Sequence, residues 1–218
     1  MPDSNACSEN MPDSNAVTSI LHDLYPDADC ALEHRRAHEL LFATIMSAQT
    51  TDANVNRVTE TLFQKYRSVR DFAEADPEIF SQEIRTTGFF RNKTKSVLGA
   101  ANMLVDEFGG DVPDTMEDLV KLPGVARKTA NVVLGTFFGK PLGVVVDTHV
   151  KRLAYRIGFT THTDPVKIEK DLMDAFPRDE WIFMGHALIL HGRAVCEARK
   201  PKCDECALVA LCEKNGVA

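Results

Sequence analysis

Apolar residues recur along most of the chain at the three-to-four-residue spacing of an amphipathic helix. One such stripe runs through residues 55–66 and another through residues 97–108. The alternation typical of half-buried strands is almost absent, and the one β-branched run, residues 144–146, is short. The pattern therefore predicts an all-α fold.

Proline and glycine residues divide this helical pattern into segments of ordinary helix length. The interruptions fall at Asp76-Pro77, Gly109-Gly110, Pro113-Asp114, Pro123-Gly124, Gly139-Lys140-Pro141, Asp164-Pro165 and Pro177. They predict roughly ten helices joined by short turns. No long linker divides the chain, but its cysteine-rich end has to pack against something besides itself. We therefore expect a second lobe that recruits the N-terminal helix.

The beginning of the chain contains a direct repeat, because residues 1–6 and residues 11–16 are identical. The repeat looks like a duplicated start, and Met11 is an alternative initiator. The segment is polar and has no helical period, so we expect residues 1–16 to be disordered or only loosely attached.

The net charge of −7 would argue against a nucleic-acid partner, but the charges are unevenly distributed. Seven of the 32 acidic residues precede residue 34, where there is no Lys or Arg, so the rest of the chain is neutral overall. Within it, residues 121–156 carry seven basic residues against the single acid Asp147, and residues 85–105 carry four against none. Such runs are compatible with a nucleic-acid surface or with an ordinary solvated face.

Four of the six cysteines lie within 17 consecutive residues near the C-terminal end. They are Cys196, Cys203, Cys206 and Cys212. So short a segment can form only one centre, and two disulfides are disfavoured because no signal segment indicates an oxidising compartment. A four-cysteine zinc site remains open, although such sites usually present two C-x2-C pairs. The unequal loops of six, two and five residues favour a 4Fe-4S cluster. Cys7 and Cys30 are expected to be ordinary thiols.

Residues 115–138 have the pattern of a helix, a tight hairpin and a second helix. Thr115 with Asp118 resembles a capping box for the first helix, and Pro123-Gly124 ends it. The short turn would expose backbone N–H groups from Gly124 to Ala126 at the start of the second helix, next to Arg127 and Lys128. Those donors favour an anion such as a DNA phosphate. The simpler alternative is an ordinary hairpin in which Gly124 only caps a helix.

Three motifs occur in a telling order: Leu122-Pro-Gly-Val-Ala-Arg-Lys-Thr-Ala130, then Val145-Val-Asp-Thr-His-Val150, then the four cysteines. Together they resemble the helix-hairpin-helix DNA glycosylases, and within them the endonuclease III group. The resemblance spans about residues 30–212, nearly the whole chain. It implies that the cysteines hold a 4Fe-4S cluster rather than zinc.

The resemblance also implies two α-helical lobes with the active site in a cleft between them. Residues 30–141 would form a six-helix barrel that carries the helix-hairpin-helix motif at residues 115–138. Residues 1–29 and 142–218 would form the iron-sulfur cluster lobe.

Lys128 and Asp147 match the catalytic lysine and aspartate of the family. Lys128 would lie in the first turn of its helix, where the helix dipole and neighbouring cations disfavour an ammonium ion. Its amine is then a nucleophile for C1′ of deoxyribose, which leads to a Schiff base and β-elimination. Asp147 would stabilise cationic character on the sugar and assist proton transfer. The simpler alternatives are a solvated surface lysine and an N-cap aspartate.

Extruding a nucleotide requires a residue that fills the vacated space and a wedge between bases. Gln49 matches the gap-filling glutamine of the family, and Phe89 occupies the place of its wedging leucine. Simple packing is the alternative role for both. Ala126 replaces the more common second glycine of the hairpin, so its methyl group could crowd the phosphate. Further DNA contacts are expected from His149, Arg199, Lys200 and Lys202.

The leading hypothesis is a bifunctional glycosylase and abasic-site lyase acting on duplex DNA with damaged pyrimidines or abasic sites. A non-catalytic DNA-binding module is one alternative. An adenine-mismatch glycosylase is another, but that group usually lacks the lysine and continues into a further domain, whereas this chain ends six residues after Cys212. No run of 18 apolar residues occurs, so we expect no membrane span. We also expect a monomer that is cytoplasmic and nucleoid-associated.

Overall fold

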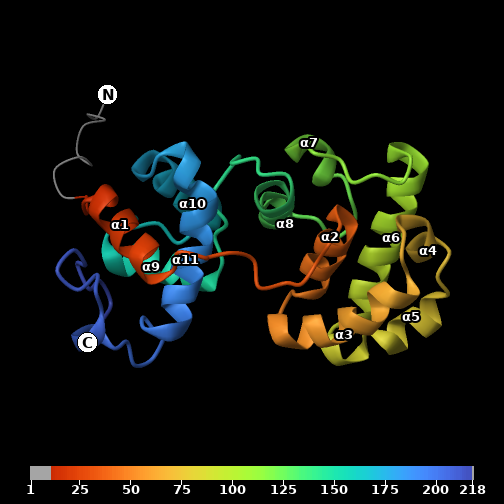
Figure 1. Ribbon diagram of the computed structural model, residues 1–218, viewed down its shortest axis with the longest axis horizontal. Helices are drawn as coiled ribbons and strands as arrows, with labels where there is room; N and C mark the ends of the chain where they lie inside the picture. The colour runs from red at the N-terminus through yellow and green to blue at the C-terminus, as the bar shows by residue number, and fades with distance from the viewer. Residues whose placement is uncertain (1–10, 218) are drawn as a thin grey trace. The chain divides into compact units, whose positions relative to one another are not determined.

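Every regular element in the computed structural model, which describes residues 11–217, is helical (Figure 1). This confirms the all-α prediction. The chain forms two compact units. The hairpin unit is Cys30–Leu142, and the cysteine unit combines the segment through Asp29 with the chain from Gly143 onward.

The hairpin unit is built around its longest helix. Its helices are α2 (Ala37–Met46), α3 (Asp52–Lys65), α4 (Val69–Ala73), α5 (Pro77–Glu83), α6 (Phe90–Phe108), α7 (Met116–Leu119) and α8 (Arg127–Val132). Helix α6 packs against α2, α4 and α5 (Figure 1). An aromatic core fills the space between them, with ring centroids 4.6 Å apart for Phe42 and Phe72 and 6.0 Å apart for Phe72 and Phe80. Burial of these large rings supplies much of the apolar stabilisation of the unit.

The cysteine unit joins the two ends of the chain. Its helices are α1 (Ser14–Leu24), α9 (Thr148–Ile157), α10 (Pro165–Ala175) and α11 (Trp181–Ala194). Helix α11 packs against both α9 and α1. Val17 and Leu21 of α1 are fully buried in one core with Leu153 of α9 and Leu188 of α11. The N-terminal helix is therefore an integral part of this unit.

The expected disorder of residues 1–16 is wrong for the end of that segment. Asp13 is the N-cap of α1, and its carboxylate accepts a hydrogen bond from the backbone N–H of Ala16 at 3.1 Å. The second copy of the repeat thus supplies a capping residue and the first helical turn, which burial of Val17 anchors. Residues 1–10 lie outside the described part of the chain.

Several interruptions read from the sequence begin helices. Asp76 accepts hydrogen bonds from the N–H groups of Glu78 and Ile79, and Pro77 occupies the first position of α5. Asp164 and Pro165 repeat this arrangement at α10. An aspartate cap followed by proline suits a helix start, because proline lacks only an N–H that would have no partner there.

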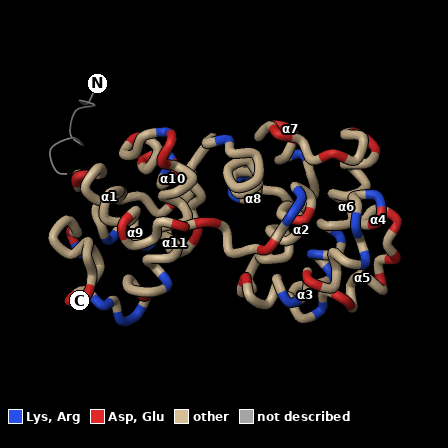
Figure 2. The backbone as a smooth tube through the Cα atoms, in the orientation of Figure 1, with Lys and Arg blue, Asp and Glu red and all other residues tan. Residues whose placement is uncertain are grey.

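Both basic and acidic residues occur along the backbone of each unit (Figure 2). Across residues 11–217, no helix is both long enough and apolar enough to cross a bilayer.

Candidate active site and cysteine centre

The hairpin between α7 and α8 depends on Gly124. Its φ is +78°, and a Cβ atom built there would lie 2.5 Å from Cβ of Ser96 on α6. No side chain fits that distance, so only glycine lets the turn approach α6 this closely. The N–H of Val125 donates to the carbonyl of Leu122 at 3.1 Å and closes the turn.

Lys128 lies in the first turn of α8, one residue after Arg127, and both are exposed. The ammonium of Lys128 has no ion pair or hydrogen bond with a described residue. By contrast, Lys121 on the other side of the turn lies 2.8 Å from a carboxylate oxygen of Asp118. Ala126 is the N-cap of α8, with extended backbone, and it is exposed. The sequence predicted one helix to Phe138, but α8 passes into a single π-helical turn, Val133–Phe137.

Asp147 is the N-cap of α9 and lies in the cysteine unit. Its Oδ1 accepts hydrogen bonds from the N–H groups of His149 and Val150 at 2.7 and 2.8 Å. Its Oδ2 lies 2.9 Å from Nδ1 of the half-buried His149. One oxygen of this carboxylate therefore caps α9, and the other contacts the imidazole of His149.

Gln49 and Phe89 both lie outside the core of the hairpin unit. Gln49 follows the end of α2, is exposed, and has a φ of +56°. Phe89 immediately precedes α6, has a φ of +46°, and leaves 64% of its surface exposed. An exposed phenylalanine in a left-handed conformation is unusual, because the side chain gains little from burial and the backbone is strained.

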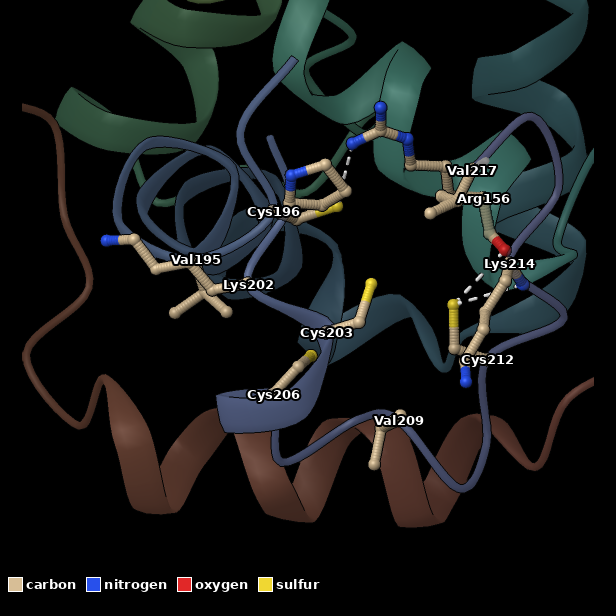
Figure 3. A pocket seen from close by; sticks show the side chains of 11 residues that line it. Arg156, Val195, Cys196, Lys202, Cys203, Cys206, Val209, Cys212, Lys214 and Val217 are labelled. Atoms are coloured by element: carbon tan, nitrogen blue, oxygen red, sulfur yellow. Dashed lines mark hydrogen bonds between the residues drawn. The ribbon is translucent and has the colours of Figure 1, made fainter. Parts of the chain in front are cut away.

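The four cysteines surround one cavity of about 30 Å³ in the cysteine unit (Figure 3). Cys196 follows α11, Cys203 begins a single 3-10 turn (Cys203–Glu205), and Cys206 and Cys212 follow that turn. Burial raises the pKa of the Cys206 and Cys212 thiols, and the neighbouring cysteines raise it further. A bound cation would favour deprotonation of these two thiols. Among the described residues, no three His, Cys, Asp or Glu side chains are close enough to hold a single metal ion.

Polar groups already surround the sulfur atoms. Arg156 is buried, and its guanidinium donates to Sγ of Cys196 at 3.3 Å and to the carbonyls of Glu197 and Ala198 at 2.8 and 2.9 Å. Nε2 of His191 lies 3.3 Å from Sγ of Cys206. The N–H of Lys214 donates to Sγ of Cys212 at 3.4 Å. Sγ of Cys212 also lies 3.2 Å from the carbonyl of Arg156. The Arg156 guanidinium and the N–H of Lys214 suit thiolates, which accept hydrogen bonds, and Nε2 of His191 does so in the tautomer that carries its proton there.

The loop between the first two cysteines carries the three basic residues expected to contact DNA. Arg199 and Lys200 are exposed. Lys202 already has partners in the protein: its ammonium donates to the carbonyl of Ala194 at 3.0 Å and lies 3.4 Å from the carboxylate of Glu197.

Comparison with known proteins identifies the family. The family described as HhH-GPD superfamily base excision DNA repair protein matches residues 42–178. The chain belongs to this superfamily. It is 53% identical to endonuclease III of Synechocystis sp. over 196 residues, 90% of each protein. It is 45% identical to endonuclease III of Bacillus subtilis over 194 residues, 88% of each.

Solved structures agree with this assignment. A non-covalent endonuclease III–DNA complex matches with a TM-score of 0.87 and 43% identity, covering 92% of this chain and 94% of that one. A trapped endonuclease III–DNA covalent intermediate matches equally well, with a TM-score of 0.87 and 42% identity. The chain is therefore a DNA glycosylase and abasic-site lyase of base excision repair, and it binds DNA. This confirms the predicted family and activity.

The basic run of this HhH-GPD protein is only partly available to DNA. Arg156 and Arg152 hold the cysteine segment instead, since Arg152 donates to the carbonyls of Cys196 and Gly192 at 3.1 and 2.9 Å. Lys140 forms an ion pair with Asp114 at 2.5 Å. Counting charges along the sequence could not reveal these internal roles, and it also missed His191 beside the cysteines.

Proposed function

We propose that Lys128 is the nucleophile of this glycosylase and that Asp147 assists it, acting on damaged pyrimidines in duplex DNA. The observation that carries the proposal is the place of Lys128, exposed and unpaired among the described residues, directly after the Gly124 turn. A hairpin that binds a phosphate would bring this amine to the sugar of a neighbouring nucleotide.

The proposed reaction begins with a nucleotide extruded from the stack. The lone pair of the Lys128 amine attacks C1′, the bond from C1′ to the base breaks, and the base leaves with that electron pair and takes up a proton. The amine then loses a proton, the sugar ring opens, and O4′ is protonated, which leaves an imine between Nζ and C1′. Removal of a proton from C2′ expels the 3′ phosphate and cuts the strand.

Asp147 is suited to assist because one of its oxygens is not needed for the helix. Oδ1 accepts both capping hydrogen bonds, while Oδ2 faces the imidazole of His149. A carboxylate in this place stabilises positive charge that develops on the sugar. His149 positions Oδ2 through its own ring nitrogen.

Gln49 and Phe89 are proposed to probe the duplex. Their exposure supports this role, since neither side chain contributes to the core. The amide of Gln49 can pair with an orphaned base, and the ring of Phe89 can stack between bases. Contacts to the DNA backbone are proposed for the hairpin residues Gly124, Ala126 and Arg127, and for Arg199, Lys200 and Lys202.

The four cysteines are proposed to hold a 4Fe-4S cluster. Four-cysteine zinc sites usually present two C-x2-C pairs, whereas this segment has one such pair flanked by two lone cysteines. Cysteines spread around one cavity, with N–H donors on two of the sulfurs and the imidazole of His191 beside a third, fit a group that has several metal corners. The cluster would hold the loop that carries Arg199 and Lys200 in place. Equal amounts of iron and inorganic sulfide in purified protein support this assignment, and zinc alone contradicts it.

Borohydride trapping on a duplex with a damaged pyrimidine tests the nucleophile, because reduction fixes only an imine between protein and DNA. We expect Lys128→Gln to abolish trapping and strand cleavage while DNA binding persists. Lys121→Gln, in the same hairpin but ion-paired with Asp118, is the matched control and should trap normally. Trapping by Lys128→Gln at the parental level contradicts the proposal.

We also propose that the enzyme acts as a monomer. If so, the activity per molecule should stay constant as the protein is diluted.

A further inference from the structure

The two residues proposed to probe DNA share an uncommon backbone conformation. In the described part of the chain, only three residues other than glycine have a positive φ: Gln49, Phe89 and Lys214. A left-handed conformation is costly for a side-chain-bearing residue and persists only where surrounding contacts hold it. The contacts that hold the Gln49 and Phe89 loops therefore determine where these two side chains would meet the DNA.

Asn54, in the first turn of α3, connects the two loops. Its Nδ2 donates to Oγ1 of Thr50 at 3.1 Å and to the carbonyl of Thr86 at 2.9 Å. Thr50 directly follows Gln49, and Thr86 lies three residues before Phe89. Because a carbonyl can only accept, the atom facing Thr86 has to be the amide nitrogen, whose two hydrogens serve the two loops.

Further hydrogen bonds hold Asn54 and the Phe89 loop in place. Thr51 caps α3 and accepts a hydrogen bond from the N–H of Asn54 at 3.3 Å. On the other side, the buried Lys93 of α6 donates from Nζ to the carbonyl of Thr87 at 2.7 Å. A buried lysine needs such an acceptor, so the Phe89 loop is held from α6 as well as from α3.

We propose that Asn54 is a positioning residue that couples Gln49 to Phe89. It keeps the residue facing the orphaned base and the residue wedged into the stack in one fixed arrangement, so that base recognition and nucleotide extrusion occur together. The inference rests on the proposed DNA-probing roles of Gln49 and Phe89. Asn54 itself touches neither the damaged base nor the reacting sugar in this scheme.

Asn54→Ala tests the coupling, with Asn56→Ala as its matched control. Asn56 lies on the same helix and also makes two hydrogen bonds, but to the backbone of Ala31 and Glu33. Single-turnover base release is measured opposite each of the four bases, alongside DNA affinity. We expect Asn54→Ala to slow base release roughly tenfold or more, because small misplacements of positioning groups are costly. We also expect the release rates measured opposite the four bases to differ less from one another than they do in the parent. Asn56→Ala should keep the parental rates and spread.

A fluorescent base placed opposite the lesion reports the coupling without turnover. In the parent, extrusion and the contact from Gln49 should change its emission in a single phase, whereas Asn54→Ala should give two phases. Thr50→Val should reproduce part of the effect, and Thr50→Ser, which keeps the hydroxyl, should restore parental behaviour.

Parental rates, spread and single-phase emission in Asn54→Ala overturn the inference. An equal loss in Asn56→Ala also overturns it, because the effect would then be general destabilisation of α3. Borohydride trapping separates this result from failure of the proposed nucleophile, since Asn54→Ala should still be trapped through Lys128, only more slowly.

Discussion

Asp147 and His149 are joined twice, through the backbone N–H of His149 on Oδ1 at 2.7 Å and through its ring Nδ1 near Oδ2 at 2.9 Å. The side chain two residues into α9 is thus held by the same carboxylate that starts the helix. A substitution at Asp147 can therefore separate the contribution of its charge from that of its cap.

Asp147→Asn should slow base release about a hundredfold or more, while DNA affinity falls only slightly. The reason is that asparagine retains an oxygen for the N–H groups of His149 and Val150 but lacks the negative charge. Single-turnover release and equilibrium binding measure the two effects separately.

Asp164→Asn is the matched control, because Asp164 caps α10 in the same way, by accepting hydrogen bonds from the N–H groups two and three residues further on. It should change the melting temperature about as much as Asp147→Asn does, and leave base release unaffected. If Asp147→Asn reduces binding and release by the same factor, the carboxylate serves only as a cap.

Gly124→Ala should destabilise the hairpin unit and weaken DNA binding. The new Cβ would meet Ser96 at 2.5 Å and would also force alanine to a φ of +78°. Strain of this kind costs about 1 to 3 kcal/mol. Urea unfolding measures the loss. Gly139→Ala isolates the backbone contribution, since Gly139 has a φ of +62° and no atom within 4 Å of its added Cβ. Equal losses in the two variants would show that the contact with Ser96 is unimportant.

His38→Phe should raise stability, more so in mild acid. His38 is buried in α2 against Phe42 and Phe72, and its Nε2 has no hydrogen-bond partner among the described residues. Removing such an orphaned group is worth about 1 kcal/mol. Burial also lowers the pKa of His38 below its ordinary value of 6.5, so the unfolded chain takes up a proton first as the pH falls.

The parent therefore loses stability as the pH falls below 6.5, toward the depressed pKa of folded His38, and the variant lacks that contribution. Urea unfolding near neutrality and about one unit below 6.5 gives the comparison. Other buried histidines contribute equally to both proteins and cancel. A difference that does not grow in acid would indicate that His38 gains a proton without cost.

The sequence predicted those parts of the fold that neighbouring residues determine. The stripe at residues 97–108 became the buried face of α6, and Asp76-Pro77 became a helix start. Those signals act within one turn of helix, so neighbouring residues determine them. The hairpin was readable for the same reason, because Pro123-Gly124 can hardly continue a helix.

Other features depend on contacts between distant segments. Arg156 counted as a surface cation in the sequence, yet it lies buried on Cys196, forty residues away. No local rule gives Gln49 or Phe89 a positive φ, because glycine and asparagine are the usual occupants of that region. The helix start at Asp13 also departs from the expected disorder, because the helix that it caps is held by burial of Val17 in the core of the cysteine unit.

The left-handed backbone at Gln49 and Phe89 has a practical consequence for engineering. Glycine at either position would relax the backbone, so a screen that rewards heat resistance alone would enrich glycine at both. The selected variants would be more stable proteins that had lost the two side chains proposed to probe the DNA. Thermostable versions of this enzyme are better sought by leaving these two positions unchanged throughout.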